Sequence, residues 1–198
     1  VRAPADGYTL TVNSVGPIAV NPTLYPKLPY NPLTDLVPIV QIADVPNVLV
    51  VNPSVPAKSL DEFIAYAKAN PGKLNYASTG VGTSAHLSGF ILAKRAGIDA
   101  IHVPYKGADA LRDLIADRVQ FMFATIPSVM SHINSGSLRA IAVSSTKRSR
   151  SLPDVPTVAE RGFPGFEAGS WFGFFAPKGT PPEVIATLNK AVNEIIAV

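Results

Sequence analysis

Residues 75–93 read NYASTGVGTSAHLSGFILA, and this stretch indicates the class of fold that the rest of the chain must form. It begins as a short apolar strand, passes through the loop STGVGTS and continues as an amphipathic helix. Glycines in such a loop allow positive φ and close approach of the backbone to a ligand, and the helix offers unpaired N–H groups and the positive end of its dipole. The sequence therefore predicts an anion-binding loop inside a strand–loop–helix unit.

Strands and helices alternate on both sides of this stretch. The pattern predicts strands at Tyr8–Asn13, Val37–Ile42, Val48–Val51, Leu74–Ala77, Ile101–Val103, Val119–Ala124, Leu138–Val143 and Ser170–Ala176. Helices are predicted from Leu60 to the Asn70-Pro71-Gly72 stop, after the loop as far as Gly97, and over Ala108–Arg118 and Pro181–Ile196. This alternation is typical of an α/β fold, and we expect its sheets to be mostly parallel and flanked by helices.

Two segments of the chain repeat one layout. Both VLVVNPSVPAKSLDEFIAYAKA and GFFAPKGTPPEVIATLNKAV read as strand, proline, short turn, capping box and helix, the boxes being Ser59–Glu62 and Thr180–Glu183. A chain that leaves one lobe, builds another and returns through a matching strand has two lobes. We expect lobe 1 to comprise residues 1–69 and 169–198 and lobe 2 residues 70–168, with a hinge near 70–73 and 167–170 and a ligand at the carboxyl ends of the strands.

Composition excludes several classes of function. The chain has 17 Lys and Arg against 14 Asp and Glu, a net charge of +3, and 47% hydrophobic residues, as in an ordinary globular protein. Its one basic run, Lys147–Arg150, is interpreted as a solvated turn, and without a basic stripe interleaved with aromatics no nucleic-acid partner is expected. No cysteine is present, and His102 and His132 lack metal-ligand spacing, so no metal site is expected.

The main alternative is an NAD(P)-dependent oxidoreductase of the Rossmann type. Residues Gly80–Ala85, GVGTSA, satisfy G-x-G-x-x-[GA] between a strand and a helix. The fingerprint also requires an acidic residue at the end of the next strand, where this chain has Pro104-Tyr105-Lys106, and Asp99 precedes that strand instead. No G-x-S-x-G nucleophile elbow occurs either. We therefore expect a binding protein with no catalytic residue and no cofactor, and keep the oxidoreductase as the alternative.

The motifs APADGYTL, AVNPTLY, KLPYNPLTD, NYASTGVGTSAHL, HVPYKG, SLPDVPTVAERGFPGFE and SWFGFFAPKGTP, in this order, resemble the Bug family. Members of this family are the extracytoplasmic solute receptors of tripartite tricarboxylate transporters. The resemblance covers essentially all 198 residues and implies a two-lobed periplasmic-binding-protein (type II, Venus-flytrap) architecture. It implies a periplasmic monomer that captures a small carboxylate (an amino acid, a di- or tricarboxylate or an aromatic acid) and delivers it to membrane transporter subunits. It also implies a chain truncated at both ends.

The ligand loops of the family carry over to this chain where residues match. STGVGTSAH matches closely and HVPYKG matches through Gly107, whereas the first corner matches in character only, and Thr125 follows Ala124 where the family often has Asp or Asn. The predicted ligand-binding residues are Ser14, Gly16, Ser78, Thr79, Gly80, Gly82, Thr83, Ser84, Tyr105, Lys106, Gly107, Thr125, Ser170 and Trp171. Backbone N–H groups of Gly80–Ser84 and the hydroxyls of Ser78, Thr79 and Thr83 are expected to hold one carboxylate. His86, in the first helical turn, is expected to be neutral and hydrogen-bonded.

Overall fold

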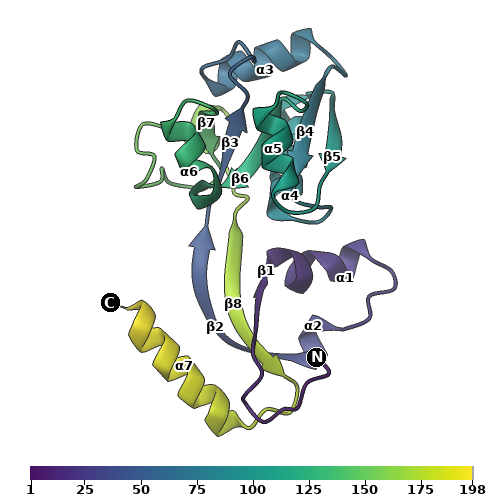
Figure 1. Cartoon of the computed structure of the whole chain (residues 1–198), viewed down its shortest axis with the longest axis vertical. Coiled ribbons are helices and arrows are strands. Elements are labelled where there is room, and N and C mark those ends of the chain that lie inside the picture. The colour runs from purple at the N-terminus through teal and green to yellow at the C-terminus, as the bar shows by residue number, and fades with distance from the viewer. Residues whose placement is uncertain (198) are drawn as a thin grey trace. The chain divides into compact units, whose positions relative to one another are not determined.

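The computed structural model describes residues 1–197, and the chain divides into two compact units (Figure 1). Unit 1 comprises Val1–Asp44 and the segment from Ser170 onward, and unit 2 comprises Val45–Gly169. Both units combine strands with helices, so the predicted α/β class is confirmed. Within the described residues no helix is both long and apolar enough to cross a membrane.

Unit 2 is built on a five-stranded sheet of order β5-β4-β6-β3-β7. Its strands are β3 (Asn47–Val51), β4 (Leu74–Ser78), β5 (Ala100–Pro104), β6 (Phe121–Thr125) and β7 (Arg139–Val143). Its helices are α3 (Leu60–Ala69), α4 (Ser84–Ala96), α5 (Asp109–Ile115), α6 (Ile126–Asn134) and the short 3₁₀ turn η2 (Ala159–Arg161). The five strands and the helices α3, α4 and α5 lie within a few residues of the positions that the sequence predicts.

The side chains of the central strands bury both faces of this sheet. Along β3, Leu49 and Val51 join one hydrophobic cluster, and Val48 and Val50 join the other. The first cluster includes Phe63 of α3 and Leu92 of α4, and the second includes residues of α5 and α6. Because successive strand residues point to opposite faces, a strand buried on both sides reads as a continuous apolar run, as VLVV does.

The sheet of unit 2 is mixed, not mostly parallel as the sequence suggests. β4 pairs in parallel with β5 and β6, and helices connect these strands in succession. β3, in contrast, pairs antiparallel with both β6 and β7. A parallel pair requires a crossover connection, and the β4–α4–β5–α5–β6 stretch provides such connections. β3 instead enters the sheet directly after β2, with no helix before it, and α3 then leads from β3 to β4.

The predicted lobe boundaries also need correction. The sequence places the strand Val48–Val51 and the helix from Leu60 in lobe 1, but both belong to unit 2, because β3 pairs with β6 and β7, and Phe63 of α3 packs on Phe121 at a ring-centroid distance of 5.0 Å. The chain passes between the units at Asp44–Val45 and at Gly169–Ser170. The first expected hinge segment, 70–73, therefore lies inside unit 2. The second, 167–170, includes Gly169–Ser170, where the chain passes from one unit to the other.

Unit 1 contains a three-stranded sheet of order β1-β8-β2, formed by Thr11–Ser14, Ser170–Pro177 and Leu36–Val45. β1 pairs antiparallel with β8, so this sheet is not the predicted parallel one. Its helices are η1 (Gly16–Val20), α1 (Asn21–Leu24), α2 (Pro32–Asp35) and α7 (Pro182–Ile196). The Asn189 side-chain amide of α7 donates to the carbonyl oxygen of Ile39 on β2 at 2.7 Å.

Only the first of the two predicted capping boxes caps its helix through the expected hydroxyl, and its glutamate bonds one residue before the cap. The Ser59 hydroxyl accepts from the Glu62 N–H at 3.2 Å, and the Glu62 carboxylate accepts from the N–H of Lys58. The Thr180 hydroxyl donates instead to the carbonyl oxygen of Pro177, and α7 begins after Pro181 without a side-chain cap. The layouts of the two segments are alike, but the second hydroxyl closes the turn before the helix and does not cap it.

Candidate functional site

The predicted anion-binding loop lies beside a cavity of about 440 Å³ in unit 2, which we call the unit 2 cavity. It is lined by Asn47, Thr79, Ser84, Ala85, Gly107, Ala108, Ala110, Leu111, Met122, Phe123, Ala124, Thr125, Ser128 and Val129. Hydroxyl groups and small apolar side chains dominate this lining, and none of these residues carries a charge. A ligand in the cavity would therefore be held by dipoles and apolar contacts.

Three helices begin at the unit 2 cavity. α4 starts at Ser84, α5 follows Gly107 and Ala108, and α6 follows Thr125, all of which line the cavity. These helices follow the carboxyl ends of β4, β5 and β6, which are neighbours in the sheet. Neither α5 nor α6 has a side-chain cap at its N-terminus, so their first-turn N–H groups have no side-chain partner there. The cavity therefore receives the positive ends of helix dipoles without a cationic side chain in its lining, and Asp109 in the first turn of α5 offsets part of the contribution of that helix.

The loop hydroxyls divide into two kinds. Ser78 is fully buried; its Oγ accepts from the Gly80 N–H at 3.2 Å and lies 2.7 Å from His102 Nε2. The Thr83 hydroxyl caps α4 by accepting from the His86 N–H, and donates to the Gly80 carbonyl oxygen at 2.7 Å. The side chains of Thr79 and Ser84 make no hydrogen bond to any other described residue and line the cavity. Ser78 and Thr83 thus hold the loop together, while Thr79 and Ser84 offer their hydroxyls to the cavity.

The two loop glycines meet a conformational need. Gly80 has a backbone φ of 139° and Gly82 one of 83°, values that residues with a side chain rarely adopt. The Gly82 N–H donates to His86 Nδ1 at 3.2 Å, and the Gly80 N–H donates to Ser78, so both amides are occupied within the loop. Two of the N–H groups expected to hold a carboxylate, those of Gly80 and Gly82, therefore already have partners in this structure, and the expectation for the Gly80–Ser84 amides stays a prediction. Neither glycine lines the cavity, and their role is to shape the loop.

The HVPYKG segment contributes less to the cavity than the sequence predicts. Gly107 lines the cavity, but Tyr105 and Lys106 do not. The Tyr105 N–H donates to the carbonyl oxygen of Ser78, and burial and the neighbouring Asp113 raise the pKa of its phenol. Lys106 is exposed. Tyr105 therefore ties β5 to the start of the loop.

Thr125 lines the unit 2 cavity, and Ser128, which is hydrogen-bonded to it, lines the cavity beside it. The Thr125 hydroxyl donates to Ser128 Oγ at 3.1 Å, and the Ser128 hydroxyl donates to the Thr125 carbonyl oxygen at 2.7 Å. Both residues line the cavity at the N-terminus of α6. The pair thus supplies polar groups from a second strand–helix junction, in addition to those of the STGVGTS loop.

Sequence reasoning missed Asn47 at the unit 2 cavity. Its side-chain amide donates to Ser88 Oγ and to the Ala168 carbonyl oxygen, both at 3.2 Å, and the Ser88 hydroxyl also donates to Ala168. Asn47 Oδ1 is buried and has no partner among the described residues. In the sequence Asn47 stands just before an apolar run and no motif marks it as a site residue. It lies beside Thr125 only because β3 pairs with β6.

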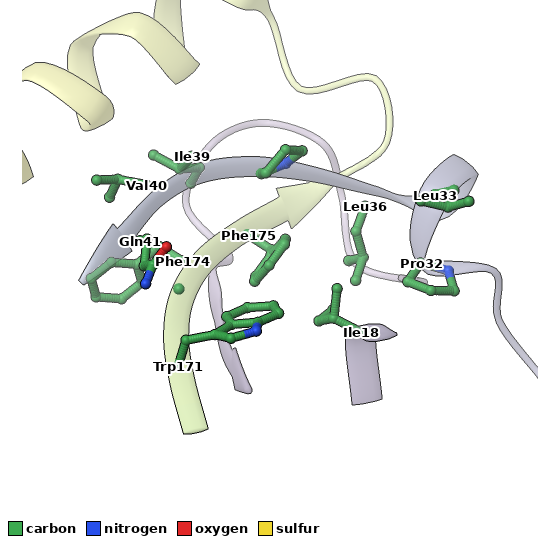
Figure 2. A pocket seen from close by; sticks show the side chains of 12 residues that line it. Ile18, Pro32, Leu33, Leu36, Ile39, Val40, Gln41, Trp171, Phe174 and Phe175 are labelled. Carbon is green, nitrogen blue, oxygen red and sulfur yellow. The ribbon is translucent and has the colours of Figure 1, made fainter. Parts of the chain in front are cut away.

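Four predicted residues belong to unit 1. Ser14 ends β1, Gly16 begins η1 and Ser170 is buried at the start of β8. Trp171 lines a separate, apolar cavity of about 590 Å³, the unit 1 cavity, where its ring lies 6.4 Å from that of Phe175 (Figure 2). Figure 2 also shows Ile18 and Leu36 across this cavity from Trp171. The assignment of these four residues to a ligand site stays a prediction.

The structure offers nothing for the dinucleotide alternative. Asp99 precedes β5, and neither Pro104, which ends the strand, nor Tyr105 and Lys106 after it are acidic, so the strand does not end on the carboxylate that would bind a ribose. Among residues 1–197, no group of three or more His, Asp or Glu side chains is placed to hold a metal ion.

Comparison with known proteins gives a consistent result. Residues 1–197 match the family model described as the tripartite tricarboxylate transporter family receptor. The chain is 44% identical to Protein BugT of Bordetella pertussis over 197 residues, which cover 98% of this chain and 60% of BugT.

Solved structures agree with this match. A structure described as R. palustris Rpa4515 with adipate is 40% identical with a TM-score of 0.93, covering 96% of this chain and 64% of that one. A structure of the periplasmic binding protein BugD is 37% identical with a TM-score of 0.89, again covering 96% and 64%. The chain therefore spans less than two thirds of the length of each of these proteins.

Proposed function

Because this chain belongs to the tripartite tricarboxylate transporter receptor family, we propose that it binds a small carboxylate and delivers it to a membrane transporter. The proposal places the protein in the periplasm, in line with the description of its relative BugD as a periplasmic binding protein. The protein binds its ligand and carries out no reaction on it, in keeping with the receptor description of the family.

The observation that carries this proposal is the convergence of three helix N-termini on a cavity without charged side chains. A carboxylate accepts hydrogen bonds from backbone N–H groups and hydroxyls, and it gains from the positive ends of the helix dipoles. Such dipoles are fixed by the fold and need not reorganise when the anion enters. Thr79 and Ser84 supply hydroxyls around the same cavity that donate to no described residue, whereas the hydroxyls of Thr125 and Ser128 donate within their own pair and would have to turn to reach a carboxylate.

The lining also indicates the kind of carboxylate. Ala85, Ala108, Ala110, Leu111 and Val129 form an apolar wall suited to methylene groups. The lining contains no aspartate or glutamate to pair with an ammonium group. We therefore favour an aliphatic dicarboxylate over an amino acid, and the adipate named for the Rpa4515 structure belongs to that class.

Calorimetric titration tests this function. We expect binding of adipate or succinate, weaker or no binding of glutamate, and no response to NAD or NADP. Absence of binding by every dicarboxylate would contradict the receptor proposal, and tight binding of NAD would favour the oxidoreductase.

A matched pair of variants places the ligand. Ala108→Leu fills the unit 2 cavity from the N-terminus of α5 and should weaken binding at least about tenfold, the effect of about 1.4 kcal/mol. Ala116→Leu adds the same side chain at the exposed C-terminal end of α5 and should leave binding unchanged. Equal affinities of the two variants would exclude the unit 2 cavity as the site.

A further inference from the structure

Two histidines stack against each other beside the ligand loop. The His86 ring of α4 and the His102 ring of β5 lie 4.1 Å apart between centroids, at an interplanar angle of 23°. Tyr76 stacks on His102 at 4.8 Å, and Phe121 stacks on Tyr76 at 5.4 Å. The column thus begins in the buried core of unit 2 and ends at His86, and its rings are held by packing.

Each histidine has a polar contact with the loop. His102 Nε2 lies 2.7 Å from the hydroxyl of Ser78, where the loop begins. His86 Nδ1 accepts from the Gly82 N–H at 3.2 Å, near the end of the loop. Because Nδ1 accepts, the proton of neutral His86 is on Nε2. Between these points the Ser78 hydroxyl accepts from the Gly80 N–H, so the contacts reach both glycines with positive φ.

We propose that His86 and His102 are positioning residues that fix the loop Ser78–Thr83 and thereby hold Thr79 and the start of α4 in the geometry that binds the ligand. The proposal rests on the proposed function for its consequence in binding. It gives these side chains a task that the cavity lining does not reveal, since neither histidine lines the cavity. The glycines make the loop conformation possible, and the histidines select it from the many that glycine allows.

The contact made by His86 requires the neutral imidazole. Burial lowers the pKa of His86, and burial together with the neighbouring His86 lowers the pKa of His102 from its ordinary 6.5 to about 4. Tyr76 of β4 faces His102, and burial raises the pKa of its phenol, so Tyr76 is uncharged. His86 of α4 faces His102 from the other side. Phe90 of α4 is tilted toward His86 and carries no charge. No carboxylate or amine among the described residues contributes to either shift.

The contacts between the histidines and the loop should weaken at low pH. Since the folded state lowers the pKa of His102 to about 4, it binds fewer protons than the unfolded chain between that value and 6.5, and the lowered pKa of His86 acts in the same direction. The loop contacts are therefore fully present above pH 6.5 and are lost as the pH falls below it through the folded-state pKa values. A proton on His86 Nδ1 would replace the acceptor with a donor and break the bond from Gly82.

Four variants test the proposal in the intact chain. His86→Phe and His102→Phe keep an aromatic ring in the column but remove the polar contact. His86→Asn places an oxygen near the Nδ1 position, and His102→Gln places a polar group near Nε2, so both retain the contact without a titrating ring. His132→Gln on α6 is the control, because His132 lies outside the column.

Two measurements distinguish a failure of the histidine proposal from a failure of the proposed receptor function. The first, amide hydrogen exchange of Gly80 and Gly82 by NMR, needs no ligand: exchange should accelerate at least about tenfold in the Phe variants and stay slow in the Asn, Gln and control variants. The second is adipate affinity: the Phe variants should bind about 2- to 12-fold more weakly, which corresponds to the loss of one hydrogen bond of about 0.5–1.5 kcal/mol.

The pH profile completes the test. Lower pH also protonates adipate, so each variant is compared with the parent: affinity should fall less steeply below pH 6.5 in His86→Asn than in the parent, and His132→Gln should follow the parent. Unchanged glycine exchange in the Phe variants would overturn the proposal even if no dicarboxylate binds. If exchange is accelerated in the Phe variants but the parent binds no adipate, the positioning role of the two histidines is supported and adipate is rejected as a ligand.

Discussion

Unit 2 and unit 1 differ sharply in how they bury apolar side chains. Unit 2 contains both hydrophobic clusters found among the described residues, and Val48–Val51 on its central strand β3 are 0% exposed. In unit 1, the buried apolar side chains of the described residues are Leu36, Ile39, Phe175 and Ala176, together with the prolines Pro32 and Pro177. Its long amphipathic helix α7 has no buried residue among those described, and Ile195 on that helix is 72% exposed.

Similar sequence patterns in the two units therefore carry different energetic weight. α3 and α7 both have an apolar stripe at helical spacing, yet Phe63 of α3 is fully buried whereas the stripe of α7 is half-buried or exposed. Most helical stability comes from packing of the apolar face. We therefore expect unit 2 to resist unfolding more strongly than unit 1.

The largest expected contrast is between side-chain truncations in the two units. Phe121→Ala removes a ring packed between Phe63 and Tyr76 and should lower the free energy of unfolding of unit 2 by about 3–5 kcal/mol. Leu33→Ala in unit 1 alters a side chain that is 88% exposed and should change the free energy of unfolding by less than about 0.5 kcal/mol. Urea unfolding followed by circular dichroism measures both. Similar losses would contradict the unequal burial of the two units.

Glycine substitutions give a second, smaller contrast. A Cβ on Gly89 of α4 would lie 2.6 Å from the Tyr76 ring, so Gly89→Ala should destabilise unit 2 by about 1–3 kcal/mol despite the better helix propensity of alanine. A Cβ on Gly173 of β8 would lie 3.1 Å from the Val40 carbonyl oxygen, a milder overlap. Hydrogen exchange of β4 and β8 amides locates each effect. A stabilising Gly89→Ala would show that Tyr76 moves freely.

Helix caps compare the two units at a lower energy. Thr83→Ala removes the cap of α4 and the bond to the Gly80 carbonyl, and should cost about 1 kcal/mol, with Thr83→Ser restoring it. Asn31→Ala removes the cap of α2 in unit 1, a four-residue helix, and should cost less. Thermal unfolding ranks the two variants. A larger loss for Asn31→Ala would contradict the view that unit 2 carries most of the stability.

The smallest contrast concerns acid. A backbone hydrogen bond from Thr157 is the main cause that lowers the pKa of Glu160 in unit 2, and one from Asn31 lowers that of Asp35 in unit 1. A carboxyl group with a lowered pKa stabilises the fold above its ordinary pKa and loses that contribution as the pH falls through the folded-state value. Glu160→Gln and Asp35→Asn should each flatten the loss of stability between about pH 5 and 3. Both groups are solvent-accessible, so the changes are expected to be small.

Fluorescence can assign these effects to a unit. The single tryptophan, Trp171, lies on β8 in unit 1, so its emission follows unit 1, whereas circular dichroism follows both units. We expect the emission of Trp171 to change at a lower urea concentration than the dichroism.

The sequence predicted the elements of the fold well where local rules apply. The strand–loop–helix unit from Leu74 to Ala96 forms as expected, because the apolar period, the Thr83 cap and Gly97 with φ of 65° agree with one another. The neutral, hydrogen-bonded state expected for His86 fits its lowered pKa and its bond from Gly82. Thr79, Ser84, Gly107 and Thr125 lie at one cavity, because neighbouring strands end at one edge of the sheet.

The α/β class, the loop and most of the helices thus follow from the sequence, since they depend on contacts between residues close in the chain. Other features follow only from the pairing of distant segments. That pairing placed β3 antiparallel in unit 2 and so brought Asn47 to the cavity, while the folded loop engaged the hydroxyls of Ser78 and Thr83 in its own hydrogen bonds. These outcomes depend on which strand pairs with which and on where a hydroxyl finds its partner, and such choices leave no periodic signal in the residues that make them.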